Sequence, residues 1–159
     1  MKRLSAYSVL AILFASVAVS WIARFVDAHG KTQIMHSAAN GNTHITQSLL
    51  LCGANVNAAD VNGWTVLMCA SVNGQTSSVH ILTNHGADIN AQNNRGLTAL
   101  MQASWYGYPR TVQCLLDRGA NPNLINKKGT NARDMALQAR HPQIVSLLED
   151  AMRKSLVTR

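Results

Sequence analysis

Hydrophobic and polar positions along this chain follow a pattern that repeats every 33 residues. In the clearest copy, Thr65 precedes an apolar run, VLMCASVN, that ends at Gly74. A second run, QTSSVHILTNH, ends at Gly86. Glycine is the residue that most easily adopts the left-handed conformation in which helices stop. The pattern therefore predicts two short helices in each unit, over residues 66–73 and 75–85 in this copy, followed by a loop.

The spacing continues along the chain without an insertion. Gly30, Gly63, Gly96 and Gly129 keep the 33-residue interval, and so do Asn57, Asn90 and Asn123. A fixed period of this length is typical of a stacked repeat array. We therefore predict an all-α solenoid of helix-turn-helix units with hairpin-like loops. Its units cover residues 27–59, 60–92, 93–125 and 126–157, and the last is expected to act as a C-terminal cap.

The same interval identifies the residues expected at contacts between units. A helix pair this short cannot bury both faces alone, so each unit needs a neighbour. Threonine hydroxyls are expected to cap the first helices by accepting from free backbone N–H groups, with an asparagine in the last unit. The leucines expected to form a continuous seam are Leu49, Leu82, Leu115 and Leu148. The small residues expected at helix contacts are Ser37, Ala70, Ala103 and Ala136. The expected caps are Thr32, Thr65, Thr98 and Asn131.

These motifs resemble the ankyrin-repeat family. The resemblance rests on residues 63–67 (GWTVL), the Ala70 to Gly74 spacing and residues 86–91 (GADINA), each repeated, and it extends from about Asp27 to Ala151. It implies a curved stack of antiparallel helix pairs that binds proteins and has no catalytic machinery. The family's Thr-Pro-Leu-His motif is absent. Met35, Met68, Met101 and Asp134 stand where its histidine is usual, so a uniform network of buried histidines is not expected.

The N-terminal segment differs from the repeats. Lys2 and Arg3 precede an uncharged, mostly apolar stretch from Leu4 to Ala23. A basic start followed by an apolar run is typical of a secretory signal, and small residues at positions 18 and 20 permit cleavage before Trp21. We predict a signal peptide over residues 1–20 and a periplasmic or secreted array of bacterial type. The alternative is an uncleaved membrane anchor reaching to about residue 23, because about 20 apolar residues span a bilayer.

Charge and composition offer little sign of catalysis or nucleic-acid binding. The formal net charge is +7, but no run of Lys and Arg is long enough for a nucleic-acid footprint, so a mildly acidic protein partner fits better. The six histidines occupy unrelated repeat positions, without metal-ligand spacing. We predict no metal site, no cofactor and no enzyme. The alternative from a different class is a thiol-dependent enzyme using Cys52 or a histidine.

The cysteines have simpler expected roles. Cys69 and Cys114 occupy apolar helix positions and are expected to pack as small hydrophobic side chains. Cys52 precedes a helix-terminating glycine and is expected to be exposed. A Cys52–Cys69 disulfide is the alternative, because the second helix of one unit ends near the first helix of the next.

Binding is expected at the positions that vary between repeats, on the loop tips and inner helix faces. In arrays that this chain resembles, these positions form a concave surface. Tryptophan, tyrosine and arginine are enriched at interface hot spots. The alternative is that Trp64 and Trp105 cover a thin core. The function predicted is a monomeric protein-interaction module of the bacterial envelope or, if anchored, an envelope scaffold. It would bind through Trp64, Val72, Gln92, Asn94, Arg95, Trp105, Tyr106, Lys127 and Lys128, with His29, Lys31 and Asn62 at related loop positions.

Overall fold

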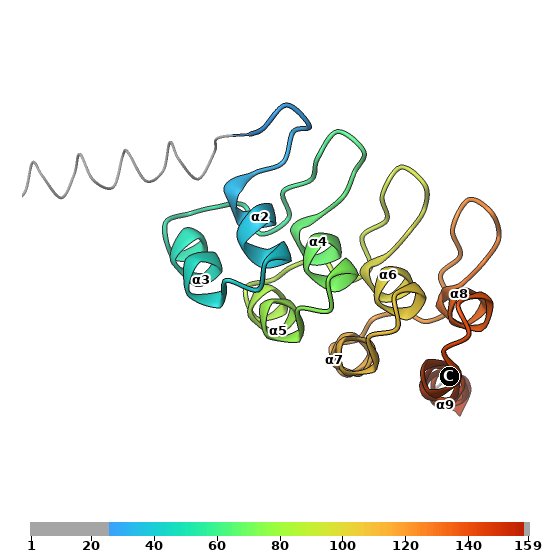
Figure 1. Cartoon of the computed structure of the whole chain (residues 1–159). Coiled ribbons are helices and arrows are strands. Elements are labelled where there is room, and N and C mark those ends of the chain that lie inside the picture. The colour runs from blue at the N-terminus through green and yellow to red at the C-terminus, as the bar shows by residue number, and fades with distance from the viewer. Residues whose placement is uncertain (1–25, 158–159) are drawn as a thin grey trace, which may run out of the picture.

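The structure, a computed structural model, describes residues 26–157 and consists of helices joined by turns and long loops (Figure 1). The all-α prediction is confirmed. Helices predicted over 66–73 and 75–85 are observed as Val66–Val72 and Thr76–Asn84. In chain order the helices are α2 (Gln33–Ala39), α3 (Thr43–Leu51), α4 (Val66–Val72), α5 (Thr76–Asn84), α6 (Ala99–Trp105), α7 (Pro109–Asp117), α8 (Ala132–Gln138) and α9 (Pro142–Val157).

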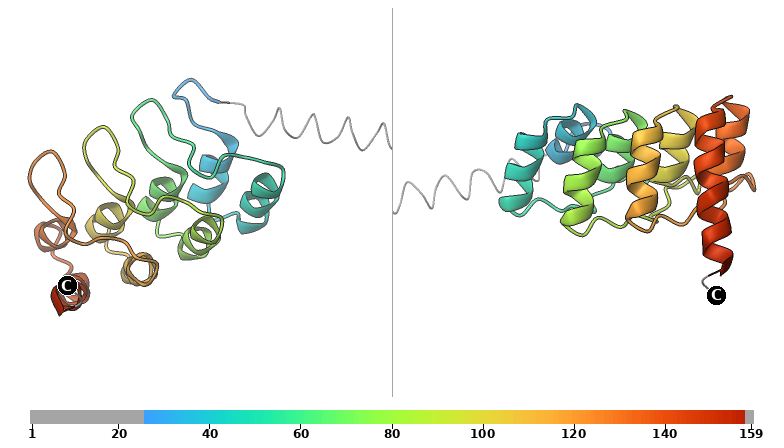
Figure 2. Two further views of the ribbon diagram at one scale, coloured as in Figure 1. Left: turned by 180° about the vertical axis from the view of Figure 1, so that it is seen from behind. Right: turned by 90° about the horizontal axis from the view of Figure 1, so that it is seen from below.

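The helices form two parallel rows. The first helices, α2, α4, α6 and α8, pack on one another in order, and the second helices, α3, α5, α7 and α9, form the other row. Long loops project from the first row on one side, and the stack curves gently (Figures 1 and 2). Two of these loops are closed by isolated β-bridges, Val26 with Thr32 and Ala59 with Thr65, which makes them hairpin-like.

The predicted seam forms the centre of the core. Leu82, Leu115 and Leu148 are fully buried, and Leu49 is buried at the end of the row. The small residues predicted at the helix contacts are buried as well: Ser37, Ala70, Ala103 and Ala136. Met35, Met68 and Met101 are also buried, and their flexible side chains belong to the core.

Caps fix where the first helices begin. Thr65 and Thr98 accept hydrogen bonds from the backbone N–H groups of Met68 and Met101, at 3.3 and 3.2 Å. Thr32 holds the same position, but its buried hydroxyl has no partner among the described residues, so the prediction is wrong there. In the last unit Asn131 and Asp134 form a reciprocal capping box.

The turn between the two helices of a unit explains one departure from the repeat. Gly107 has a φ of 79°, and a Cβ there would lie 2.6 Å from the His141 ring of the next unit. Gly41 and Gly74 meet the following unit in the same way. The fourth unit has Arg140 at this position, with a φ of 61°. No described unit follows it, so the side chain has room, although the backbone conformation remains unfavourable for a residue other than glycine.

The predicted signal peptide or membrane anchor lies outside the described residues. Within residues 26–157, no helix has both the length and the apolar character needed to cross a membrane.

Candidate protein-binding surface

Each projecting loop is built around one Asp or Asn side chain. Asp27, Asp60, Asn93 and Asn126 occupy the same repeat position. The Oδ1 atom of each accepts hydrogen bonds from the backbone N–H groups two and four residues later, at 2.8 to 3.2 Å. Sequence reasoning missed this series, although its 33-residue spacing was a visible signal.

In the first loop, the side chain that accepts these hydrogen bonds is a carboxylate, which carries a charge. The hydrogen bond from the backbone N–H of Lys31 lowers the pKa of Asp27 below its ordinary value. The backbone N–H of His29 and the His36 side chain lower it further, each to a smaller extent. Asparagine at the same position in the later loops supplies the same acceptor oxygen without a negative charge. Loop geometry therefore does not require an acid, and the choice between Asp and Asn sets the local charge.

Hydrogen bonds join neighbouring loops into a row. The N–H of Asn94 donates to the carbonyl of Asn62 at 3.0 Å, and that of Lys127 donates to the carbonyl of Arg95 at 3.1 Å. The amide of Gln92 donates to the carbonyls of Gly96 and Ile125, both at 2.9 Å. The amide of Asn94 donates to Val61 at 3.2 Å. Gln92 and Asn94, predicted as binding residues, therefore use their amide groups within the array.

A hollow of about 320 Å³ lies between the last three loops and the helices α6 and α8. It brings together five of the predicted binding residues: Trp64, Arg95, Trp105, Tyr106 and Lys128. Trp105 and Tyr106 are 40% and 51% exposed, whereas Trp64 is half-buried against the core. Trp64 therefore packs against the core, whereas Trp105 faces solvent. We call this space the aromatic hollow.

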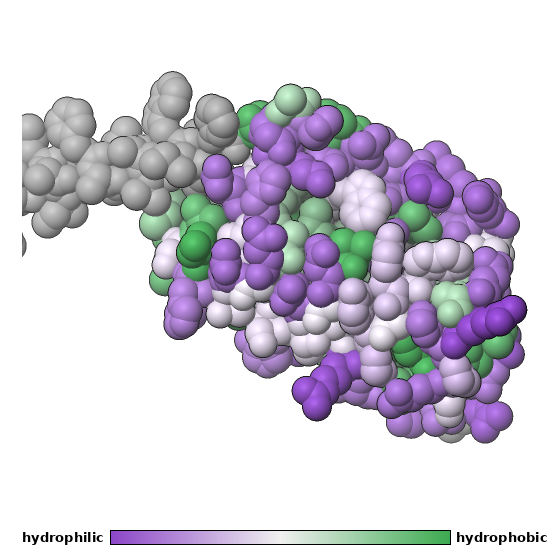
Figure 3. Space-filling view, in the orientation of Figure 1, coloured by the Kyte–Doolittle hydropathy of each residue, from purple (hydrophilic) through white to green (hydrophobic). Residues whose placement is uncertain are grey.

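A second hollow, of about 410 Å³, lies on the other side of Trp64. Val72 lines it with Lys31, His29 and Asn62, so further residues singled out from the sequence gather here. Trp64 borders both hollows. Lys127 is exposed at the tip of the last loop and lines neither of them. In the view of Figure 3, hydrophobic surface is divided into small areas within hydrophilic surface.

Sequence reasoning also missed residues on the floor of these hollows. His36, Cys69, Gln102 and Met135 share one position of the first helix. Cys69 lines the second hollow, and Gln102 and Met135 line the aromatic hollow. The signal was a helix position that changes residue type in every unit, beside methionines that stay constant in the first three.

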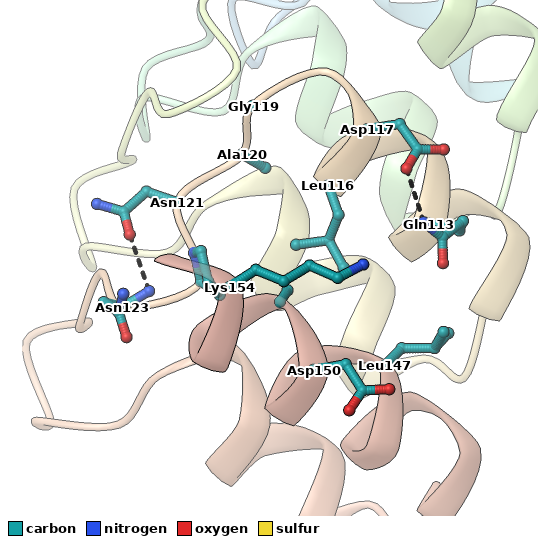
Figure 4. Close-up of a pocket in the computed structure, with 12 residues that line it drawn as sticks. Gln113, Leu116, Asp117, Gly119, Ala120, Asn121, Asn123, Leu147, Asp150 and Lys154 are labelled. Atoms are coloured by element: carbon teal, nitrogen blue, oxygen red, sulfur yellow. Dashed lines mark hydrogen bonds between the residues drawn. The ribbon is translucent and has the colours of Figure 1, made fainter. Parts of the chain in front are cut away.

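A further hollow, of about 760 Å³, lies away from the predicted site (Figure 4). It lies between the end of α7 and the overhanging second half of α9, which has 16 residues where α7 has 9. Lys154 reaches across it from α9, and Gln113 donates to Asp117 at 2.7 Å on the opposite wall. None of the predicted binding residues lines it.

Two of the three cysteines are poorly suited to act as nucleophiles. Cys52, Cys69 and Cys114 are free thiols, so the Cys52–Cys69 alternative is wrong. Burial raises the pKa of Cys69 to about 11 and also raises that of Cys114, which disfavours the reactive thiolate. Cys52 is exposed, as predicted. Within the described part of the chain, no group of His, Cys, Asp or Glu is arranged to hold a metal ion.

The stacked helix pairs and the row of projecting loops define a helical repeat solenoid of the kind that binds other proteins. Residues 8–93 match a family model described as ankyrin repeats (3 copies), and residues 81–136 match one described as ankyrin repeats (many copies). The chain belongs to the ankyrin-repeat family. A search of curated proteins found no match. Ankyrin repeats are non-catalytic protein-interaction modules, and the chain is accordingly a binding protein and not an enzyme.

Proposed function

We propose that the array binds one partner protein through its concave surface, defined as the surface formed by the projecting loops and the first helices. The observation that carries this proposal is the aromatic hollow, where Trp64, Trp105 and Tyr106 meet Arg95 and Lys128. Aromatic and arginine side chains clustered at the centre of a surface are the usual hot spots of protein interfaces. Trp105 and Tyr106 are the principal contacts, because both are well exposed yet held at the end of α6.

The cations have a different role from the aromatic side chains. Arg95 and Lys128 lie at the hollow, and Lys127 lies on the same loop as Lys128 but outside it. Charges at the rim of an interface mainly speed association and make it depend on salt. We therefore assign affinity chiefly to the aromatic residues and encounter rate chiefly to the cations.

Affinity capture from an extract of the source cells tests this proposal. The wild-type array should retain a partner protein that Trp105→Ala and Tyr106→Ala variants no longer retain. Leu51→Ala is the matched control, because Leu51 is 78% exposed on α3, in the opposite helix row. A partner that is lost equally with Leu51→Ala, or kept by both aromatic variants, would contradict the proposed surface.

We further propose that the repeats lie outside the cytoplasm, in the periplasm of a bacterium. The support is the basic start and the uncharged segment Leu4–Ala23 in the sequence. Release by osmotic shock of a protein starting at Trp21 agrees with cleavage. Retention of the full chain in the membrane fraction favours the anchored scaffold instead, and recovery in the cytoplasm contradicts both.

A further inference from the structure

Positive charge is concentrated in the second half of the loop row. His29, Asn62, Arg95 and Lys128 occupy one position in successive loops. Loops 93–97 and 126–130 carry three cations and no acid, because Asn93 and Asn126 replace the aspartates of the first two loops. Since either residue supplies the acceptor oxygen that shapes the loop, this replacement leaves the fold intact and removes negative charge beside the aromatic hollow.

The aromatic hollow itself contains no counter-charge. Among the described residues that line it, Arg95 and Lys128 are charged and none is acidic. Neither cation forms an ion pair within residues 26–154. Two unpaired cations beside three aromatic rings favour a ligand that carries carboxylates next to an apolar side chain.

Gln102 provides a feature suited to a polypeptide backbone. Gln102 lines the hollow and is 5% exposed. Its carboxamide forms no hydrogen bond with another described residue and is not among the fully buried unpaired groups, so its polar atoms are accessible to a ligand in the hollow. A carboxamide offers both a donor and an acceptor, which matches the free N–H and C=O groups of an extended segment. A helix would offer fewer, because its backbone groups are bonded internally.

We propose that the aromatic hollow binds an extended, acidic segment of the partner protein, an inference that rests on the proposed function. Two carboxylates of the segment pair with Arg95 and Lys128, and an apolar side chain between them packs against Trp105 and Tyr106. Gln102 bonds the segment's backbone. Neighbouring helices pack about 8–10 Å apart, and an extended chain rises about 3.3 Å per residue. Alternate side chains of an extended chain point the same way, so the two acids and the apolar residue between them face the hollow together when the acids stand about four residues apart.

A single-stranded nucleic acid is the other ligand with negative charge and apolar rings. Such ligands usually follow a basic groove that contacts several phosphates. Two cations in one hollow are too few for that, and the family binds proteins. The observations therefore favour an acidic peptide, and nucleic-acid binding becomes an outcome of the test.

Selection from a phage-displayed library of random peptides tests the inference directly. Wild-type array should enrich sequences with two Asp or Glu residues about four apart and an apolar residue midway between them. The Arg95→Gln/Lys128→Gln variant should lose the acidic preference. Lys127→Gln is the matched control for the Lys128→Gln half of this variant, since it removes one charge from the same loop outside the hollow, and it should keep the preference. Selection that enriches no acidic sequences, or an acidic preference that survives the double variant, overturns the inference.

Affinities of one selected peptide separate the possible failures. Each neutralised cation should weaken binding about threefold, and Gln102→Met, which copies Met135, should weaken it without lowering Tm. A polythymidine oligonucleotide should not compete; tighter binding of the oligonucleotide than of the peptide contradicts an acidic protein segment. If non-acidic peptides bind and Trp105→Ala abolishes their binding, the inference fails while the proposed function stands. If alanine variants of Trp64, Trp105 and Tyr106 all bind as tightly as wild type, the proposed function is contradicted as well.

Discussion

At the scale of single residues, packing against the next unit explains which side chains the repeat tolerates. The His141 ring occupies the space where a Cβ on Gly107 would lie, and His141 also bonds the Trp105 carbonyl at 3.1 Å. Arg140 is free of such a contact but keeps a φ of 61°. The sequence alone showed that glycine was missing at this turn, but the unfavourable conformation could be recognised only from the backbone.

Replacing Arg140 with glycine should stabilise the array. Left-handed backbone costs a residue other than glycine about 1–2 kcal/mol, and part of this gain is offset by the greater freedom of glycine in the unfolded chain. We expect a net gain of up to about 1 kcal/mol in the free energy of unfolding, measured by urea denaturation. Gly107→Ala is the control and should destabilise. A loss of stability in Arg140→Gly would show that the arginine side chain contributes more than its backbone costs.

Thiol labelling tests the burial of Cys69. Its pKa of about 11 lies above the ordinary value of 9.0, so little thiolate forms at pH 8 in the folded protein. Iodoacetamide followed by mass spectrometry should label exposed Cys52 quickly and Cys69 much more slowly in the folded protein. Because the folded pKa is raised, the stability contributed by this group is present below about pH 9 and falls as the pH rises toward 11. Labelling of Cys69 as fast as Cys52 would refute its burial.

At the scale of helices and loops, the 33-residue pattern predicted most of the architecture. It located helix α4 within one residue and identified the buried leucine seam. It did not show which loop side chains bond neighbouring loops. Lys127 and Lys128 are adjacent in sequence, yet only Lys128 lines the aromatic hollow. Such distinctions depend on how one loop packs on the next, which a single unit does not encode.

The leucine seam predicts a large loss of stability on truncation. Leu82 is fully buried, so Leu82→Ala should lower the free energy of unfolding by about 2–5 kcal/mol. Leu51→Ala, at a position that is 78% exposed, should stay within about 0.5 kcal/mol of wild type. Urea denaturation of both variants measures the difference. Equal effects would mean that the seam is not the core of the array.

The loop built on Asn126 allows charge to be changed with little change of shape. Asn126→Asp keeps the oxygen that accepts from Lys128 and Thr130, and restores the residue type of the first two loops. We expect a Tm close to wild type and about threefold weaker binding of an acidic peptide. Calorimetry and peptide titration measure these two quantities. Undiminished binding would mean that the charge beside the hollow has no effect on the ligand.

At the scale of the whole molecule, stacking creates a surface that no single unit possesses. The aromatic hollow takes Trp64 from the second unit, Trp105 from the third and Lys128 from the fourth. The sequence predicted these residues because they vary between repeats and are of the types found at hot spots. It could not predict that Val72, at the repeat position of Trp105, would line a different hollow, because that depends on which neighbours pack beside each helix.

The most direct test of the account measures stability and affinity on the same variants, Trp105→Ala and Tyr106→Ala. Both residues are at least 40% exposed, so both variants should keep a Tm near wild type. Removing a hot-spot residue typically costs about 2 kcal/mol or more, so binding of the captured partner should weaken at least about thirtyfold. The contrary result is a Trp105→Ala array that unfolds while its folded fraction binds the partner as tightly as wild type.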